Sequence, residues 1–392
     1  MKVYLEARIP GWKLHSLYDS MINYPPEGVS FVGDKVTQQS MNGSMMRGID
    51  RYVSTVKELK TVLSLVKPSL YYAYYKIHRG RTNQDVDLIY SSQHLIFDDF
   101  PWVVDLESVA ALIGYGRLGG FRGIIETALA SDSCKRIIPW TDAGKETLFR
   151  NLNCKGFDDK IETVNLAVPP RHFVREKSDD MIRMLFVGTG NSFNVRGSFE
   201  MKGGREIAMA FKKLRKKYGN LELTIRCWAP SVYVQNCRNE GIRIIPQLIS
   251  SAQLAKEFEQ ADIFVYPGHT TPGVVLLDAM SYELPVVATD IWANREMISD
   301  GRTGLLTKPS RYAEYDGGSV MAGWGEPSYM SIQRIDPEMV EDLVTKLSYL
   351  IENPDLRHAM GRNGRTEIED GKYSLKERNR KLGRIFRESL GS

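Results

Sequence analysis

Short apolar runs alternate with amphipathic helical patterns along this 392-residue chain. Short runs of this kind, bounded by Gly, Pro and polar residues, are typical of strands buried in parallel sheets. They lie at residues 3–7, 88–90, 102–104, 136–138, 183–188, 221–225, 242–245, 263–266 and 285–288. Because helical patterns separate these runs, the chain is predicted to be an α/β protein with doubly wound parallel sheets.

The pattern is interrupted at residues 175–180, which are polar and charged and have no periodicity. A segment of this kind is typical of a linker, and a buried strand starts again at residue 183. We therefore predict one Rossmann-like domain over residues 1–178, a second over residues 179–372, and a closing helix over residues 373–392. The chain length agrees with two or three domains of about 100–200 residues each.

Composition narrows the class of protein. The chain is 42% apolar and 26% charged, as in ordinary globular proteins, and a net charge of +4 is too small to indicate nucleic-acid binding. Its four cysteines have no metal-ligand spacing and are few for a secreted scaffold, which favours a reducing cytoplasm. No apolar run approaches the roughly 20 residues that cross a bilayer, and the N-terminus does not read as a signal peptide.

The most informative segment covers residues 266–290. It reads as a strand end, a polar loop, a helix that Gly273 opens, and a second buried strand. A helix that starts near the carboxyl end of a parallel strand provides a site for anions, because its first backbone N–H groups have no partner in the helix. Asp278, more than one turn further on, can direct its carboxylate to the same crevice. The segment therefore predicts a ligand that carries phosphate and hydroxyl groups.

The same segment resembles the donor-sugar motif of retaining GT-B glycosyltransferases of family 4. In that motif a Glu precedes Phe-Gly, and a second Glu stands eight positions after the first. Thr270 occupies the first Glu position, Pro272 the Phe position, Gly273 the Gly position and Asp278 the second Glu position. Other segments resemble the family in matching order: they lie at residues 184–188, 201–203, 261–267, 301–306 and 351–357.

This resemblance implies a GT-B fold, with two Rossmann-like domains facing a cleft and the closing helix packed back on the first domain. It implies transfer of a sugar from a nucleoside diphosphate to a glycan, lipid-linked or protein acceptor. The reaction is expected to retain the anomeric configuration and to need no metal or other cofactor. The residues expected to bind the donor are Gly188, Thr189, Arg196, Lys202, His269, Thr270, Thr271, Gly273, Val274 and Asp278.

Lys202 is the strongest catalytic candidate. A lysine at a glycine-rich helix start favours anions, and in the family this Lys neutralises the leaving diphosphate. The family Arg that follows the Val-Gly strand is replaced by Thr189, so Arg196 is the candidate for its role. The alternative for both basic residues is an ordinary solvated surface position.

The two altered acid positions affect sugar recognition. A charge-assisted hydrogen bond contributes about 1.5–3 kcal/mol and a neutral one about 0.5–1.5 kcal/mol. Thr270 in place of Glu is therefore expected to weaken sugar binding about tenfold, with Thr271 and His269 offering further contacts. Asp278 is a shorter acid where the family holds ribose with Glu. It stands among apolar residues, so it is expected to have a partner.

The first half must supply the acceptor site and any catalytic base. Family members often carry a His after a strand near the donor sugar, where this chain has Asp105 and Glu107. These two acids, and His94 after an earlier strand, are the candidates for the base. The Pro10-Gly11 turn after the first strand is a candidate backbone loop for phosphate or acceptor.

Basic and aromatic residues are interleaved over residues 51–81. This combination suits an anionic membrane surface, where each basic side chain contributes about 1 kcal/mol. The region therefore indicates a peripheral contact at the inner face of a membrane, where lipid-linked acceptors would be met. A solvated helix over an aromatic core is the alternative.

Two other functions fit the same fold and donor motif. The altered Thr270 and Thr189, together with the missing family histidine, are compatible with a GT-B protein that binds a nucleotide sugar without turnover. A nucleotide-sugar epimerase of GT-B fold would also share the donor site.

Overall fold

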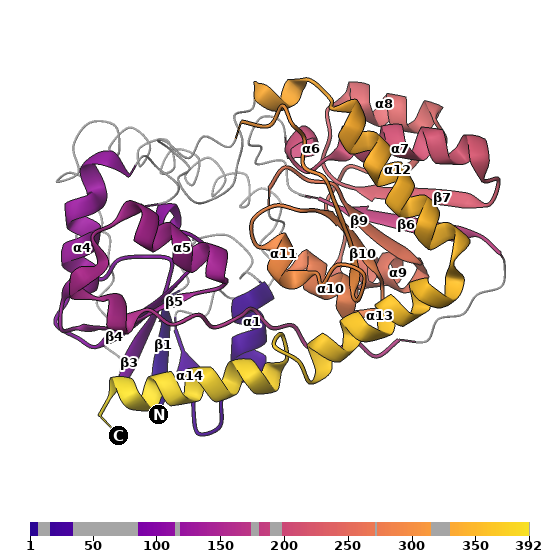
Figure 1. The fold of residues 1–392 in the computed structure, drawn as a ribbon. Helices are drawn as coiled ribbons and strands as arrows, with labels where there is room; N and C mark the ends of the chain where they lie inside the picture. Colours follow the sequence, from indigo (N-terminus) through magenta and orange to yellow (C-terminus); the bar gives the residue numbers. More distant parts are fainter. Residues whose placement is uncertain are drawn as a thin grey trace, which may run out of the picture. The chain divides into compact units, whose positions relative to one another are not determined.

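The computed structural model describes residues 1–6, 16–33, 85–113, 118–173, 180–188, 198–270, 273–314 and 330–391. These residues form two compact units, drawn in Figure 1. Unit 1 contains residues 1–166 and 376–391, and unit 2 contains residues 167–314 and 330–375. The division after Leu166 comes earlier than the expected boundary near residue 178, because residues 167–173 pack with unit 2.

Unit 1 is built on a five-stranded parallel sheet in the order β2-β1-β3-β4-β5. All residues of the two strands β3 and β4 are buried, which explains why both are mainly apolar; the polar exceptions are Ser91, Ser92 and Asp105. The strands are β1 (Lys2–Glu6), β2 (Ser30–Val32), β3 (Leu88–Ser92), β4 (Trp102–Leu106) and β5 (Cys134–Pro139). The helices are α1 (Ser16–Asn23), α4 (Arg122–Ala130), α5 (Asp142–Asn151) and α14 (Leu375–Ser389).

The closing helix α14 packs against unit 1, far from its neighbours in sequence. The buried guanidinium of Arg378 donates to Ser20 Oγ at 2.9 Å and to the Tyr24 carbonyl at 2.7 Å. About two turns further on, Phe386 makes edge-on ring contacts with Phe31 and Tyr90. These contacts place the last helix of the chain in the same unit as its first strands.

Unit 2 is built on a six-stranded parallel sheet in the order β11-β10-β9-β6-β7-β8. The strands are β6 (Ile182–Val187), β7 (Leu221–Arg226), β8 (Arg243–Ile245), β9 (Ile263–Tyr266), β10 (Val286–Thr289) and β11 (Gly304–Thr307). The helices are α6 (Ser198–Met201), α7 (Gly204–Lys217), α8 (Ser231–Asn239), α9 (Ser251–Gln260), α10 (Val275–Ser281), α11 (Asn294–Met297), α12 (Pro337–Glu352) and α13 (Pro354–Glu369).

The strand order of unit 2 locates a crevice. Counted from β6 in chain order, the sheet runs 3-2-1-4-5-6, the order of dinucleotide-binding Rossmann folds. The order reverses between β6 and β9, which pair directly. Ligands of such sheets bind beyond the carboxyl ends of the strands at this reversal.

Helix α7 follows β6 and covers the sheet with an apolar face. Ile207, Ala210, Phe211 and Leu214 are buried at the spacing of one helix face. On its outer side, Lys213 and Lys217 form ion pairs with Glu341 and Glu352 of α12, which runs beside it in Figure 1. These exposed pairs orient the two helices and add little stability.

Candidate donor-binding site

The candidate donor residues gather at the carboxyl ends of β6 and β9. Gly188 follows β6, and its backbone is held by Arg226: the Gly188 N–H donates to the Arg226 carbonyl at 2.8 Å, and Arg226 Nη1 donates back to the Gly188 carbonyl at 3.0 Å. A Cβ atom on Gly188 would lie 2.5 Å from Cys227 Sγ. The Cys227 side chain thus occupies the space that a side chain at residue 188 would need, which explains why glycine follows this strand.

The start of helix α7 packs directly on the loop that follows β9. Gly203 has φ 83°, and a Cβ atom here would collide with the Pro267 carbonyl. The His269 N–H donates to the Met201 carbonyl at 2.9 Å. The Lys-Gly step noted in the sequence is therefore the point where the helix start meets the donor loop, which we define as residues 267–270.

Lys202 and Thr270, 68 positions apart in sequence, meet at this junction. Lys202 Nζ donates to Thr270 Oγ1 at 3.0 Å, and the Thr270 side chain is buried. Burial raises the pKa of the neighbouring Tyr266 hydroxyl, and the Lys202 ammonium acts in the opposite direction. The structure thus joins two of the predicted donor residues through a direct hydrogen bond.

His269 lies deeper than the sequence predicted. Its imidazole is 1% exposed, and Nε2 lies 3.4 Å from Glu206 Oε1, on the first turn of α7. The side chain expected to contact the sugar faces the buried carboxylate of Glu206 instead. Glu206 was not identified from the sequence, although a charged residue among the apolar positions of a core-facing helix is a signal that could have been used.

On the far side of the donor loop, Gly273 has φ 69° and leads into α10 through Val274. Asp278, within α10, is 24% exposed, and its Oδ1 lies 3.7 Å from Arg171 Nη2. Burial raises the pKa of Asp278 to about 6, and the Arg171 guanidinium opposes this shift. The expected partner of this acid is therefore present within the protein. Arg171 stands just before the linker and was not singled out by the sequence.

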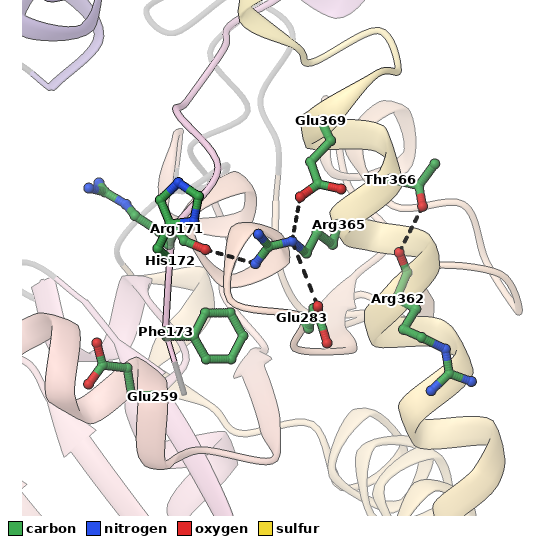
Figure 2. A pocket seen from close by; sticks show the side chains of 9 residues that line it. All are labelled: Arg171, His172, Phe173, Glu259, Glu283, Arg362, Arg365, Thr366 and Glu369. Atoms are coloured by element: carbon green, nitrogen blue, oxygen red, sulfur yellow. Dashed lines mark hydrogen bonds and ion pairs between the residues drawn. The ribbon is translucent and has the colours of Figure 1, made fainter. Parts of the chain in front are cut away.

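Arg171 also lines a cavity of about 1030 Å³, shown in Figure 2. Arg365 organises its wall: its Nε lies 2.7 Å from Glu369 Oε1 and 3.7 Å from Glu283 Oε1, and its Nη1 donates to the Arg171 carbonyl at 2.8 Å. The remaining lining residues are His172, Phe173, Glu259, Arg362 and Thr366. Its three arginines and three glutamates cancel in formal charge, so the cavity does not indicate an anion.

This cavity is not the predicted nucleotide site. Glu259 precedes β9 and Glu283 precedes β10, so these lining residues lie toward the amino ends of the strands. Gly188 and the donor loop lie at the opposite, carboxyl ends.

In unit 1, Asp105 is an internal anchor and not an accessible base. Its side chain is fully buried and accepts hydrogen bonds from Tyr18 Oη at 3.1 Å, Tyr90 Oη at 3.0 Å and Trp140 Nε1 at 2.9 Å. Burial raises its pKa to about 7, and the three donors oppose this shift. The sequence could not predict that Asp105 is an internal anchor, because the three hydrogen-bond partners of Asp105 come from α1, β3 and the end of β5.

Glu107 and His94 remain candidates for the base on the acceptor side. Glu107 directly follows β4, and His94 follows β3, the neighbouring strand, so both lie at the carboxyl edge of the unit 1 sheet. Both residues are half-buried. The His94 carbonyl accepts from Ser91 Oγ at 2.6 Å, which fixes the turn after β3.

Several predicted residues lie outside the described part of the chain: Pro10, Gly11, Thr189, Arg196, Thr271 and the basic-aromatic region 51–81. Among the residues that the structure does describe, no three His, Cys, Asp or Glu side chains are grouped to hold a metal ion. Within the same residues, no helix is both long and apolar enough to cross a membrane.

The residues that form this site also match a known protein family. Residues 182–315 match the family model of the glycosyl transferases group 1. The matched residues lie within unit 2. The match covers β6 to β11, and therefore Gly188, Lys202, the donor loop and Asp278.

Two solved structures show the same fold as this chain. The Anabaena protein HepE, solved with UDP and glucose, has a TM-score of 0.59 at 12% identity, covering 99% of this chain and 100% of that one. A Rickettsia africae glycosyltransferase has a TM-score of 0.59 at 13% identity, covering 99% and 98%. The GT-B fold expected from the resemblance is thus confirmed.

A sequence relative covers a smaller part. The sulfoquinovosyl transferase SQD2 of Arabidopsis thaliana is 29% identical over 134 residues, which are 33% of this chain and 20% of that protein. The match therefore spans about a fifth of the length of this curated relative.

Proposed function

We propose that this chain is a glycosyltransferase that binds a nucleoside-diphosphate sugar in unit 2 and transfers the sugar to an acceptor hydroxyl. The observation that supports this most strongly is the hydrogen bond from Lys202 Nζ to Thr270 Oγ1 at the strand-order reversal. A cation near this reversal supports the proposal, because sheets with the Rossmann strand order bind phosphates there. The family model matches the segment that contains Lys202 and Thr270, which supports the same function.

In the proposed reaction, the bond between the sugar C1 and the diphosphate oxygen breaks, and its electron pair leaves with the diphosphate. A new bond forms between C1 and the acceptor oxygen, whose proton passes to a base. Lys202 stabilises the negative charge that develops on the leaving phosphate, which is often the largest catalytic contribution. Glu107 and His94 are the proposed candidates for the base.

The finer features are also proposals. Retention of configuration and independence of metal rest on the resemblance of residues 266–290 to the family 4 donor motif. The structure of HepE with UDP and glucose makes UDP-glucose the first donor to test. Glycans, lipid-linked sugars and proteins are the acceptor classes to compare. A contact of residues 51–81 with anionic membranes would favour the lipid-linked class.

A thermal-shift panel of nucleoside diphosphates and their sugars tests the donor site. Ligand at 100 times its Kd stabilises a protein by about 2.7 kcal/mol, enough to raise Tm by several degrees. We expect a rise with at least one nucleoside diphosphate and a larger rise with its matching sugar nucleotide. No rise with any of them, in folded protein, would overturn the proposed function.

Thr270 in place of Glu supports a second candidate, a protein that binds the donor without turnover. Product analysis separates the possibilities. Release of free nucleoside diphosphate from a sugar nucleotide indicates transfer or its hydrolytic side reaction. A changed sugar without release indicates an epimerase, and tight binding with neither outcome indicates a binding protein.

A further inference from the structure

The first turn of α7 contains a carboxylate that packing alone does not explain. Glu206 is 1% exposed and is followed by the core residues Ile207 and Ala210. Its Oε1 lies 3.4 Å from His269 Nε2 and 3.9 Å from Arg205 Nη2. Its Oε2 is buried and has no hydrogen-bond partner among the described residues.

Burial of a carboxylate in this position costs desolvation free energy. Removing an ionised acid from water is costly unless hydrogen bonds satisfy both oxygens, and a whole buried charge pair can often be replaced by apolar residues without loss of stability, whereas removing one partner alone is destabilising. An apolar side chain at residue 206 would continue the buried face of α7. The role of Glu206 is therefore expected to lie in its contact with the donor loop.

Glu206 and Lys202 hold two consecutive residues of the donor loop from the same helix start. Lys202 Nζ donates to Thr270 Oγ1 at 3.0 Å, and Glu206 Oε1 faces the imidazole of His269. The His269 N–H is also tied to the Met201 carbonyl. The orientation of His269 therefore bears directly on where Thr270 presents its hydroxyl.

The guanidinium of Arg205 lies beside the Glu206 carboxylate, with Nη2 3.9 Å from Oε1. Arg205 Nη1 donates to the Gln333 carbonyl at 3.0 Å, and Nη2 donates to the Ile332 carbonyl. Its side chain is 10% exposed. A chain of contacts thus runs from Arg205 through Glu206 and His269 to the donor loop.

We infer that Glu206 is a positioning residue for sugar transfer, acting through His269 on Thr270 and Lys202. The carboxylate selects the imidazole tautomer that carries its proton on Nε2 and directs that N–H to α7. Nδ1, which is buried and has no hydrogen-bond partner among the described residues, is then the acceptor nitrogen. This fixes the loop in the conformation that holds the Lys202 ammonium at the crevice. The inference rests on the proposed function.

The test compares the wild-type protein with Glu206→Leu, Glu206→Gln and Ile207→Val. Glu206→Leu removes the carboxylate but keeps an apolar face on α7. Glu206→Gln keeps an acceptor oxygen for His269. Ile207→Val is the matched control, because it removes a methyl group from the fully buried neighbour on the same helix without removing the His269 contact. For each protein the experiment measures Tm, the Kd for UDP, GDP and ADP, nucleotide release from UDP-glucose, and the ¹⁵N chemical shifts of His269.

We expect Glu206→Leu to lower Tm, because it leaves the His269 imidazole and the Arg205 guanidinium without their carboxylate partner. It should also weaken binding of the preferred nucleoside diphosphate about fivefold or more and lower turnover about tenfold. Its His269 spectrum should lose the pure Nε2–H tautomer seen in the wild type. Glu206→Gln should recover much of the binding. Ile207→Val should lower Tm and leave Kd and the His269 spectrum unchanged.

The inference would be overturned if Glu206→Leu kept the Kd, the turnover and the His269 spectrum of the wild type. So would equal losses in Glu206→Leu and Ile207→Val, since activity would then follow stability alone. If the wild-type protein binds none of these three nucleotides and no other member of the thermal-shift panel, the proposed function fails. The His269 spectra of the wild type and Glu206→Leu still decide in that case whether Glu206 sets the tautomer.

Discussion

The Arg171 guanidinium lies 3.7 Å from the carboxylate of Asp278, the residue at the second acid position of the donor motif. This pair connects the segment that opens unit 2 to helix α10. Because Arg171 opposes the effect of burial, it keeps more of Asp278 ionised at neutral pH than burial alone would allow. The acid expected to bind ribose thus depends on a residue more than 100 positions earlier in the chain.

Arg171→Gln is expected to raise the pKa of Asp278 further above its present value of about 6. If the ionised carboxylate binds ribose, affinity for the nucleoside diphosphate falls as the pH falls through this pKa. The fall should therefore occur at higher pH in the variant, which Kd measurements between pH 5 and pH 8 would detect. Arg362→Gln is the control, since Arg362 lines the same cavity and points away from Arg365 in Figure 2. Tighter binding by Arg171→Gln at every pH would contradict the prediction.

Lys202→Ala is expected to weaken binding of a nucleoside diphosphate about tenfold or more and to leave the affinity for the matching nucleoside unchanged. The reason is that an ammonium at the helix start interacts with phosphate and not with the base. Calorimetry with UDP and uridine, or with the pair that the thermal-shift panel selects, provides the measurement. Equal losses for both ligands would remove Lys202 from this role.

Gly203→Ala should destabilise unit 2 by about 1–3 kcal/mol, because φ 83° is strained for alanine and its Cβ atom collides with the Pro267 carbonyl. The same collision should displace the donor loop and weaken nucleotide binding. Gly219→Ala is the control, since a Cβ atom there meets nothing within 4 Å. Urea unfolding and nucleotide titration measure the two effects. A Gly203→Ala protein as stable as Gly219→Ala would show that the loop yields without cost.

Asp105→Asn should change how stability depends on pH. Since burial raises the folded-state pKa of Asp105 to about 7, the folded protein holds this proton where the unfolded chain has lost it. The contribution of Asp105 to stability is fully present below its ordinary pKa of about 3.9 and is lost as the pH rises to about 7. One pKa unit corresponds to about 1.4 kcal/mol, so the stability difference between the two proteins should shift in favour of Asp105→Asn by a few kcal/mol.

Urea unfolding of both proteins at pH 4, 5.5 and 7.5 gives this difference, because the other titrating groups are common to both. At low pH the wild type is expected to be the more stable, since a protonated carboxyl still accepts from the surrounding hydroxyl and indole donors. A difference that stays constant with pH would mean that Asp105 keeps an ordinary pKa in the folded protein.

The sequence by itself determined the local features of this protein. The apolar runs at residues 263–266 and 285–288 correspond closely to β9 and β10, and the loop between them to the donor loop and α10. The Lys-Gly step at residues 202–203 was placed correctly at a helix start. These features depend on the spacing of apolar residues and on the conformational freedom of glycine, both of which act over a few neighbouring positions.

Only the tertiary structure decided which side chains face one another. Asp105 and Glu107 look alike as acids near a strand end. Asp105 is enclosed by two tyrosines and a tryptophan from three other elements, whereas Glu107 is half-buried. The same is true of the contacts of Asp278 and His269. Each of these contacts joins residues about 60 or more positions apart, except where a neighbouring strand contributes. Hydrophobic periodicity fixes the face on which a residue lies, whereas the packing of whole elements decides what lies opposite it.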